Sequence, residues 1–195
     1  MKLVFATHNP NKLKEIQKLV PSFIELVSLD EIGCTEDIPE TASSLEGNAR
    51  IKASYVTKTY NFPCFADDTG LIVNALNGEP GVYSARYAGP QKNSKANMTK
   101  LLRNLKYKNN RTAFFKTVIA LNIKGETHIF EGTVDGEITE KETGQNGFGY
   151  DPIFKPNGYE ETFGQLPLSV KNKISHRGLA FKKLITYLNN INVTR

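Results

Sequence analysis

Residues 2–28 read KLVFATHNPNKLKEIQKLVPSFIELVS, and this stretch decides the fold class. Its two ends, 2–6 and 23–28, are short apolar runs typical of buried strands. Between them, apolar residues recur at the three- and four-residue spacing of one helix face: Leu13, Ile16 and Leu19 or Val20. A strand, a helix and a second strand in this order form a βαβ unit, so the stretch predicts an α/β fold.

The rest of the chain continues with mixed helical and extended patterns. Helices are predicted at 45–60, 94–105 and about 179–189, the first after a capping box at Ser43-Ser44-Leu45-Glu46. Strands are predicted from 64 to the paired aspartates at 67–68, at 71–76, and at 112–123 and 127–138, the last two joined as an antiparallel hairpin by a turn at 124–126. The sequence shows no repeats or linkers. We therefore expect one mixed α/β domain over residues 1–195, with two lobes and a cleft between them.

Composition bounds the classes of protein that the chain can represent. Hydrophobic residues make up 39% of its 195 residues and aromatic residues 10%, which suffices for a packed core and argues against general disorder. The formal charge of +5 and the pI of about 9.1 favour anionic partners without naming one. The densest basic cluster, KYKNNR at 106–111, is small, and a solvated loop explains it better than a nucleic-acid site, so no nucleic-acid partner is expected.

Cysteine content and hydropathy bear on where the protein works. Cys34 and Cys64 lie far apart and outside any CxxC spacing, which argues against a disulfide framework or a zinc site. The apolar run at the start is too short for the core of a signal peptide, and no later stretch could span a bilayer. The sequence therefore predicts a soluble, cytoplasmic protein with no membrane partner.

Residues 7–12, THNPNK, connect the first predicted strand to the first predicted helix. The backbone N–H groups and the dipole of a helix N-terminus favour an anion, and Lys12 on the first turn can reach a phosphate. Either Asn9 or Asn11 can cap the helix. Because the segment is not a glycine-rich phosphate loop, a capped helix with an exposed lysine remains an open alternative.

Residues 64–71, CFADDTGL, place two adjacent carboxylates after an apolar run. Side chains on a strand alternate between its faces, so Asp67 and Asp68 can enter one cleft only if the strand ends there, and Thr69-Gly70 supplies the turn. With Glu40 upstream, the pair offers hard oxygen ligands for Mg²⁺. A solvated turn is the alternative, since repulsion and desolvation both oppose burying two bare carboxylates.

Two later segments also contain residues whose types suggest a binding role and not only a structural one. NGFGYDP at 146–152 sets Phe148 between two glycines, so its ring is open for stacking, although an ordinary core aromatic would also fit. KNKISHRG at 171–178 gathers Lys171, His176 and Arg177 at a helix entry, where they can bind an anion or a base, or where the histidine is structural. Together the four segments offer carboxylates for a metal, cations for phosphates and a ring for a base, which a nucleoside triphosphate site requires.

With these segments in order, the chain resembles the inosine triphosphate pyrophosphatase family, the non-canonical purine nucleoside triphosphatases. The resemblance runs from Thr7 to the final helix, nearly the whole chain. Five motifs carry it: T-x-N-x-x-K at 7–12, ADDTGL at 66–71, PGVYSARYAG at 80–89, GFGYDPIF at 147–154 and ISHRG at 174–178. Each motif alone is weak, whereas five in this order are highly specific.

The resemblance implies an activity, a fold and an assembly. The implied activity is Mg²⁺-dependent hydrolysis of ITP, dITP and XTP at the α–β phosphoanhydride to the monophosphate and pyrophosphate. Such a housecleaning hydrolase of nucleotide metabolism removes deaminated purines from the nucleotide pool. The implied fold is α/β, with an elongated mixed sheet flanked by helices and two lobes around a central cleft, and the implied assembly is a homodimer.

The resemblance also assigns roles to residues at matching positions. It implies that Glu40 and Asp68 bind Mg²⁺ with Asp67 in support, and that Asp68 is the catalytic proton acceptor. It implies substrate contacts by Thr7, His8, Asn9, Pro10, Asn11, Lys12, Thr69, Phe148, Gly149, Tyr150, Asp151, Lys171, His176 and Arg177. The chain departs from the pattern in SSLEGNA, where Gly47 stands in place of a common glutamate, and at Ser169-Val170, where two glutamates are common.

Three other functions fit parts of the sequence. A basic nucleic-acid-binding domain would bind in a salt-dependent manner without a metal, but it leaves Asp67, Asp68 and Glu40 unexplained. A nucleotide-binding regulator would bind ITP without turnover. A pyrophosphatase acting on modified pyrimidines would keep the chemistry and change the base. Pyrophosphate release from a panel of nucleoside triphosphates separates these functions.

Overall fold

The computed structural model describes residues 1–17 and 19–193, except for the side chains of Pro10, Asn11, Glu15, Asn192 and Val193. The chain opens with β1 (Lys2–Phe5), α1 (Pro10–Gln17) and β2 (Glu25–Val27). β1 pairs with β2 in parallel, with Leu3 opposite Leu26. The βαβ unit predicted from the first 28 residues is therefore confirmed, and with it the α/β class.

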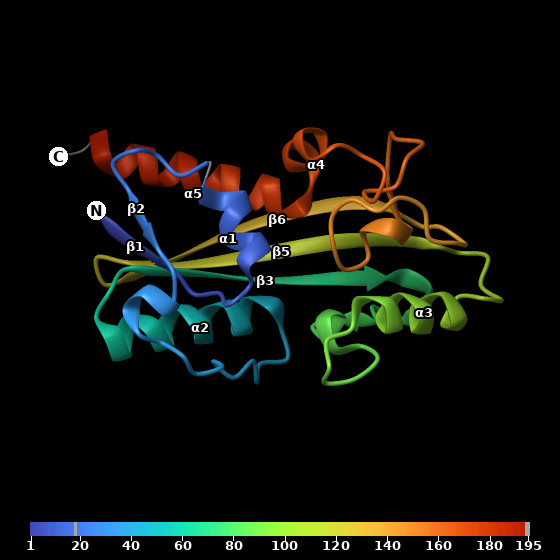
Figure 1. Cartoon of the computed structure of the whole chain (residues 1–195), viewed down its shortest axis with the longest axis horizontal. Coiled ribbons are helices and arrows are strands. Elements are labelled where there is room, and N and C mark those ends of the chain that lie inside the picture. The colour runs from blue at the N-terminus through green and yellow to red at the C-terminus, as the bar shows by residue number, and fades with distance from the viewer. Residues whose placement is uncertain (18, 194–195) are drawn as a thin grey trace. The chain divides into compact units, whose positions relative to one another are not determined.

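The strands of the described chain join into one seven-stranded sheet (Figure 1). Its order is β2-β1-β3-β5-β6-β7, with β4 paired to β3. β1 runs parallel to β3, whereas β4 is antiparallel to β3 and β7 is antiparallel to β6, so the sheet is mixed as expected. The later strands are β3 (Cys64–Val73), β4 (Pro80–Gly81), β5 (Thr112–Ile123), β6 (Glu126–Ile138) and β7 (Phe154–Pro156).

The bounds of β5 and β6 confirm the predicted hairpin to within one residue. Lys124 and Gly125 form its two-residue turn, and both have positive φ, 51° and 80°. Two consecutive residues of positive φ match the right-handed twist of the strands that they connect. The turn therefore fixes which residues of the two strands face each other.

The helices confirm two predictions and correct a third. After α1 come α2 (Leu45–Tyr60), α3 (Ser94–Asn104), α4 (Leu168–Ile174) and α5 (His176–Val193), with short 3₁₀ turns at η1 (Asp30–Ile32), η2 (Asn74–Leu76), η3 (Ser84–Arg86) and η4 (Asp151–Ile153). The sequence analysis missed α4 and began the last helix about three residues late. The reason is that 168–178 is mostly polar, and its two apolar residues at helical spacing, Val170 and Ile174, are too few to predict a helix. None of the described helices is long and apolar enough to cross a membrane.

The start of α2 also differs from the predicted capping box. Ser44 is the N-cap, and its hydroxyl accepts the N–H of Gly47 at 3.0 Å. The residue three positions after the cap is thus a glycine, which has no side chain to complete a capping box. A Cβ on Gly47 would lie 2.5 Å from the Cβ of Ala42. Glycine therefore lets the preceding loop approach the first turn of α2 closely.

The described chain divides into two compact units, each built from separate stretches. Unit 1 consists of Met1–Asp68, Thr117–Glu131 and the chain from Ala180 on, and unit 2 consists of Thr69–Lys116 and Gly132–Leu179. The stretches are separate because β3, β5 and β6 contribute residues to both units. The prediction of one domain over residues 1–195 stays a prediction.

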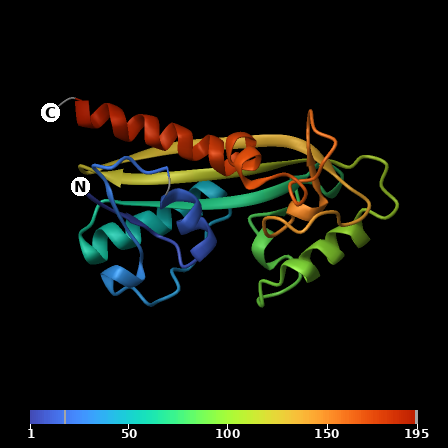
Figure 2. The same cartoon turned by 45° about the horizontal axis from the view of Figure 1, so that its top comes forward.

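Unit 1 has a helical layer on each face of its strands. Figure 1 shows α2 on one face and α1 with α5 on the other, and in Figure 2 α5 follows the β5–β6 hairpin. Alternation along the strands fills both layers. One core contains Leu3, Phe5, Phe65, Ile119 and Leu121 with α1 and α5, and the other contains Val4, Ala6, Cys64, Ala66 and Ala120 with α2.

Unit 2 has its own core, formed between α3, the later half of β3 and the segment around η4 and β7. Its buried members include Leu71, Val73, Met98, Leu101, Phe115, Ile153, Phe154 and Phe163. The motif at 80–89 is tied to α3 from several directions. The side-chain oxygen of Asn97 accepts the N–H of Ala88 at 2.6 Å, and Nζ of Lys100 donates to the carbonyl of Tyr87 at 2.6 Å. This motif therefore has a structural role.

Candidate functional site

The paired aspartates lie inside a strand and not at its end. β3 continues past them to Val73, so the predicted break at Thr69-Gly70 is wrong. The physical reason is that Leu71 and Val73, beyond the pair, are fully buried in the core of unit 2. Burying those two side chains favours a continuous strand over a turn.

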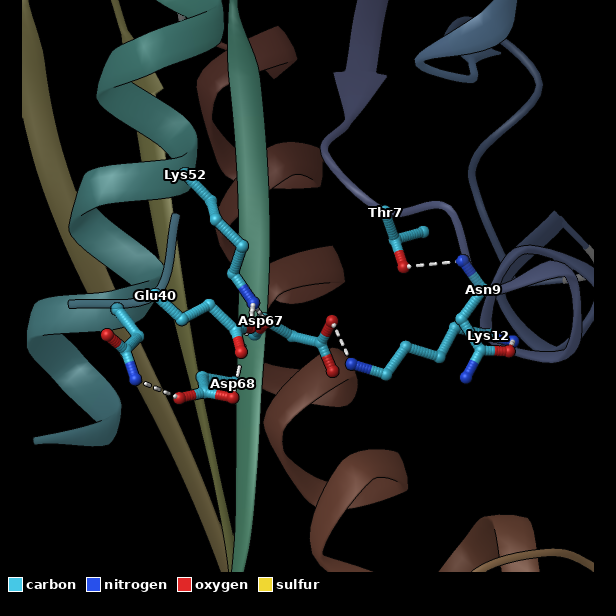
Figure 3. A network of polar contacts seen from close by, with 8 residues as sticks. Thr7, Asn9, Lys12, Glu40, Lys52, Asp67 and Asp68 are labelled. Atoms are coloured by element: carbon cyan, nitrogen blue, oxygen red, sulfur yellow. Dashed lines mark hydrogen bonds and ion pairs between the residues drawn. The ribbon is translucent and has the colours of Figure 1, made fainter. Parts of the chain in front are cut away.

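Because β3 continues, the two carboxylates emerge on opposite faces. Asp67 shares the face of Phe65, which packs with α1 and α5, and Asp68 shares the face of Ala66, which packs under α2. Figure 3 shows the two carboxylates pointing away from each other, toward different partners. Opposite faces reduce the mutual repulsion that made the adjacent pair unusual.

The carboxylate of Asp67 meets the first turn of α1 (Figure 3). Nζ of Lys12 lies 2.8 Å from Oδ1 of Asp67, whose side chain is completely buried. Two local bonds shape this turn: Oγ1 of Thr7 accepts the N–H of Asn9 at 3.1 Å, and Oδ1 of Asn9 accepts the N–H of Lys12 at 3.4 Å. Asn9, and not Asn11, is therefore the residue that caps the helix.

The other residues of 7–12 do not join this group in the described structure. Nε2 of His8 lies 3.1 Å from the carbonyl oxygen of Glu36, and its Nδ1 lies 3.7 Å from the carboxylate of Asp30. The backbones of Pro10 and Asn11 begin α1, and their side chains lie outside the described part. Among the sequence-predicted phosphate contacts, Thr7, Asn9 and Lys12 are thus linked in one turn, and Lys12 ties that turn to Asp67.

On the other face of β3, the sequence analysis missed two residues of α2. Nζ of Lys52 donates to Oε1 of Glu40 at 2.8 Å and to the carbonyl oxygen of Asp67 at 2.6 Å, and it lies 4.0 Å from Oδ1 of Asp68. The side-chain amide of Asn48 donates to Oδ2 of Asp68 at 3.0 Å. One buried lysine and one buried amide therefore hold the predicted catalytic carboxylate from two sides (Figure 3).

A signal for the missed residues exists in the sequence. Asn48 and Lys52 are four apart, so they lie on one face of α2, next to the small apolar residues Ala49 and Ala53. Polar side chains beside a buried apolar stripe require buried partners. That pairing rule, applied to 45–60, would have indicated a carboxylate opposite α2.

The charges of this carboxylate–lysine cluster do not balance. It contains three carboxylates, those of Glu40, Asp67 and Asp68, and two ammonium groups, those of Lys12 and Lys52. Burial raises the pKa of Asp68, Glu40 raises it further, and the lowering effects of Lys52 and Asn48 do not offset this. Burial alone would lower the pKa of Lys52, but the three surrounding carboxylates raise it overall. The cluster therefore favours additional positive charge.

The donor set fits a hard divalent cation that takes only a few of its ligands from the protein. Glu40 and Asp68 both approach the same ammonium group, which shows that their oxygens converge on one cationic position. Among the described residues, no three histidine, cysteine or acidic side chains gather as a metal-holding group. Two carboxylates leave most of a coordination sphere to water and substrate oxygens, an arrangement that suits Mg²⁺ more than Zn²⁺.

Unit 2 contains a second polar group, centred on Asp151. Oδ2 of Asp151 accepts two hydrogen bonds, one from the backbone N–H of Phe148 at 2.7 Å and one from Nζ of Lys171 at 2.8 Å. Both charged side chains are almost fully buried. Gly147 has a φ of 77°, and a Cβ there would overlap the carboxylate of Asp151. The glycine and the carboxylate together fix the loop that carries Phe148.

Two cations lie against the ring of Phe148. Nζ of Lys171 and Cζ of Arg177 are each 5.0 Å from its centroid, within the range of a cation–π contact. His176, from the same turn as Arg177, stacks on Phe115 with centroids 4.5 Å apart and an interplanar angle of 19°. α4, the start of α5 and the 146–152 loop thus bring Lys171 and Arg177 to Phe148, whereas His176 packs against Phe115.

The three remaining predicted contacts are also in unit 2, and they differ in kind. Thr69 is half-buried in β3. Gly149 has a φ of 65°, with no atom near the position of a Cβ. Tyr150 is buried, and its hydroxyl donates to the carbonyl of Ser84 at 2.8 Å, so its side chain is part of the core.

The two polar groups define the kind of protein to which the chain belongs. A basic helix start beside buried carboxylates suits a phosphate chain with a cation, and a half-buried ring flanked by cations suits an electron-rich planar group. Both belong to an α/β protein that handles nucleotides. The chain belongs to the Ham1 family, whose model matches residues 3–187.

Individual relatives agree with this assignment. The chain is 61% identical over 188 residues to a dITP/XTP pyrophosphatase of Christiangramia forsetii, covering 96% of this chain and 99% of the relative. It is 49% identical over 185 residues to a dITP/XTP pyrophosphatase of Bacillus subtilis, covering 93% of each. The solved structure of the Staphylococcus aureus Ham1 protein matches with a TM-score of 0.91 at 41% identity, covering 97% of this chain and 99% of that one.

Proposed function

We propose that this protein hydrolyses non-canonical purine nucleoside triphosphates, namely dITP, XTP and ITP, to the monophosphate and pyrophosphate. Family membership and the names of relatives at 61% and 49% identity support the reaction. The observation that supports its chemistry most directly is Asp68, a buried carboxylate between the amide of Asn48 and the ammonium group of Lys52. The orientation of this carboxylate is therefore set by its two protein partners and not by contacts with water.

Asp68 is the residue that we assign to proton transfer. In this proposal it accepts a proton from the water that attacks the α phosphorus, and pyrophosphate leaves. Its raised pKa makes it a stronger base than an exposed aspartate. Lys12 and Lys52 stabilise the negative charge that the phosphates carry in the transition state.

Mg²⁺ is the proposed cofactor, held by Glu40 and Asp68 with Asp67 in support through Lys12. Their hard oxygen donors and the excess negative charge of the cluster support it. When bound, the cation would neutralise charge on the phosphates and polarise the scissile bond. The ammonium group of Lys52 occupies the convergent position in the described structure, so we propose that it moves toward a phosphate when the cation binds.

We assign recognition of the purine base to residues of unit 2. Phe148 offers a ring for stacking, which every purine can use. Arg177 and His176 offer N–H donors that suit the 6-oxo group of hypoxanthine or xanthine and oppose the 6-amino group of adenine. A site built for such a bond can discriminate by about 10⁴-fold, because the wrong base leaves buried donors unpaired.

A homodimer and a cytoplasmic location complete the proposal, and both rest on the family resemblance. Analytical ultracentrifugation tests the first, and fractionation of cells tests the second. The activity is tested with ITP, dITP, XTP, ATP, GTP and dUTP in the presence of Mg²⁺. Release of monophosphate and pyrophosphate from ITP, dITP and XTP, but not from ATP, GTP or dUTP, supports the proposal. Turnover of a pyrimidine in preference to ITP, or binding of ITP without turnover, would support one of the rival functions.

A further inference from the structure

The positive charge of the chain is concentrated in one stretch. Residues 80–125 contain ten lysines and arginines and no aspartate or glutamate, whereas the rest of the chain has 15 basic and 20 acidic residues. The stretch covers the turns around η3, all of α3 and all of β5. The basic cluster at 106–111 alone understates this excess of positive charge, because the other cations lie elsewhere in residues 80–125.

Four of these cations are exposed and have no carboxylate partner among the described residues: Lys92, Arg103, Lys106 and Lys108. Lys95 and Lys100, on α3 itself, line a hollow of about 630 Å³ together with Asn93, Thr99 and Arg103. Lys95 is paired with Glu142, and Lys100 is bonded to the carbonyl of Tyr87. The surface of α3 and its two flanking turns, which we name the α3 strip, therefore has unbalanced positive charge and a recess.

One exposed aromatic ring precedes α3 in the chain and another follows it. Tyr107, just after the helix, is 86% exposed, and Tyr83, just before η3, is 58% exposed, and these are the largest exposures among the large apolar side chains described. Each ring has its own cation: Nζ of Lys106 is 5.2 Å from the Tyr107 centroid, and Cζ of Arg86 is 5.3 Å from that of Tyr83. η3 contacts α3, so the pair of Arg86 and Tyr83 lies at the helix. Rings that are exposed to this extent have no role in the core.

We propose that the α3 strip binds single-stranded nucleic acid. Cations that follow a backbone of phosphates, with aromatic rings on which unpaired bases stack, are the two components of such surfaces. An anionic membrane or an acidic protein would pair with the cations but offers no unpaired bases to stack on the rings, and a duplex keeps its bases inside the stack. All residues of the α3 strip lie in unit 2, and none belongs to the catalytic or binding residues proposed above.

Fluorescence anisotropy with a labelled oligo(dT) of about 20 nucleotides tests the proposal. Four unpaired cations predict that log affinity falls with log salt with a slope of about −3, a loss of about 50-fold between 50 and 200 mM. The double variant Arg103→Gln/Lys106→Gln should bring the slope to about −1.5. Tyr107→Ser should weaken binding about tenfold at constant salt. Hydrolysis of dITP should be unchanged in both variants.

Lys58→Gln/Lys182→Gln removes the same charge from exposed positions elsewhere and serves as the matched control. It should leave the slope near −3. Equal weakening by the control and the α3 double variant would overturn the proposal, because the binding would then reflect net charge alone. Absence of oligo(dT) binding, equal affinity for duplex DNA of the same length, or binding only to phosphatidylserine vesicles would also overturn it.

Discussion

Nζ of Lys171 lies 2.8 Å from Oδ2 of Asp151, and the two side chains are only 5% and 4% exposed. The same carboxylate oxygen accepts the N–H of Phe148. Asp151 thus accepts hydrogen bonds from both Lys171 and the Phe148 backbone, and because it is buried it has little surface left for a substrate. We infer that Asp151 positions Lys171 and the Phe148 loop and does not itself contact the nucleotide.

Asp151→Asn should therefore lower stability as well as activity. It leaves the ammonium group of Lys171 buried without its counter-charge, which costs about 3–5 kcal/mol when a buried pair is broken from one side. Urea denaturation measures this loss. Lys171→Met added to Asp151→Asn should recover part of it, because no buried charge is then left alone. Additive losses in the double variant would show that the two side chains do not act as a pair.

Gly147→Ala and Gly149→Ala form a matched pair around Phe148. A Cβ at 147 overlaps the carboxylate of Asp151, whereas a Cβ at 149 meets no atom, and both glycines have positive φ. Gly149→Ala should thus show only the backbone cost, about 1 kcal/mol, and Gly147→Ala should lose about 2–3 kcal/mol. Thermal unfolding of the two variants checks this order. Equal losses would mean that the loop can move away from Asp151 without cost.

Asp68→Asn should remove activity but stabilise the metal-free protein at neutral pH. Burial holds the pKa of Asp68 above its usual range, so the folded state binds this proton more tightly than the unfolded state. The free energy of unfolding therefore falls as pH rises from about 4 through the folded pKa, and asparagine removes this loss. We expect the variant to be more stable than the wild type in EDTA at pH 7 and equal to it near pH 3. A variant that is less stable at pH 7 would show that the charged form of Asp68 is favoured by folding.

Base choice should separate from base stacking. Phe148→Ala should lower kcat/KM about tenfold for every accepted purine, with the ITP-to-ATP ratio little changed. Arg177→Met or His176→Phe should instead shrink that ratio, mainly by lost activity on ITP, since each removes a donor to the 6-oxo group. Measured kcat/KM values for ITP and ATP decide the matter. A ratio that collapses only in Phe148→Ala would reverse the assignment.

The sequence was a good guide to elements whose burial pattern repeats and a poor one to contacts between distant segments. The apolar run from Leu3 to Ala6 and the turn at Lys124-Gly125 predicted β1 and the hairpin, because each pattern is local. Lys52 was missed because its partners, Glu40 and Asp68, lie 12 and 16 residues away. β3 was cut short because the burial of Leu71 in unit 2 is visible only in the fold.

In the proposed reaction, Asp68 directs water to the α phosphorus of a non-canonical purine nucleoside triphosphate. Hydrolysis of dITP by the wild-type protein with Mg²⁺ in ¹⁸O-labelled water, followed by mass spectrometry of both products, tests it most directly. We expect one ¹⁸O atom in dIMP, none in pyrophosphate, and no product above background with Asp68→Asn. Label in pyrophosphate, release of orthophosphate, or full activity of Asp68→Asn would contradict it.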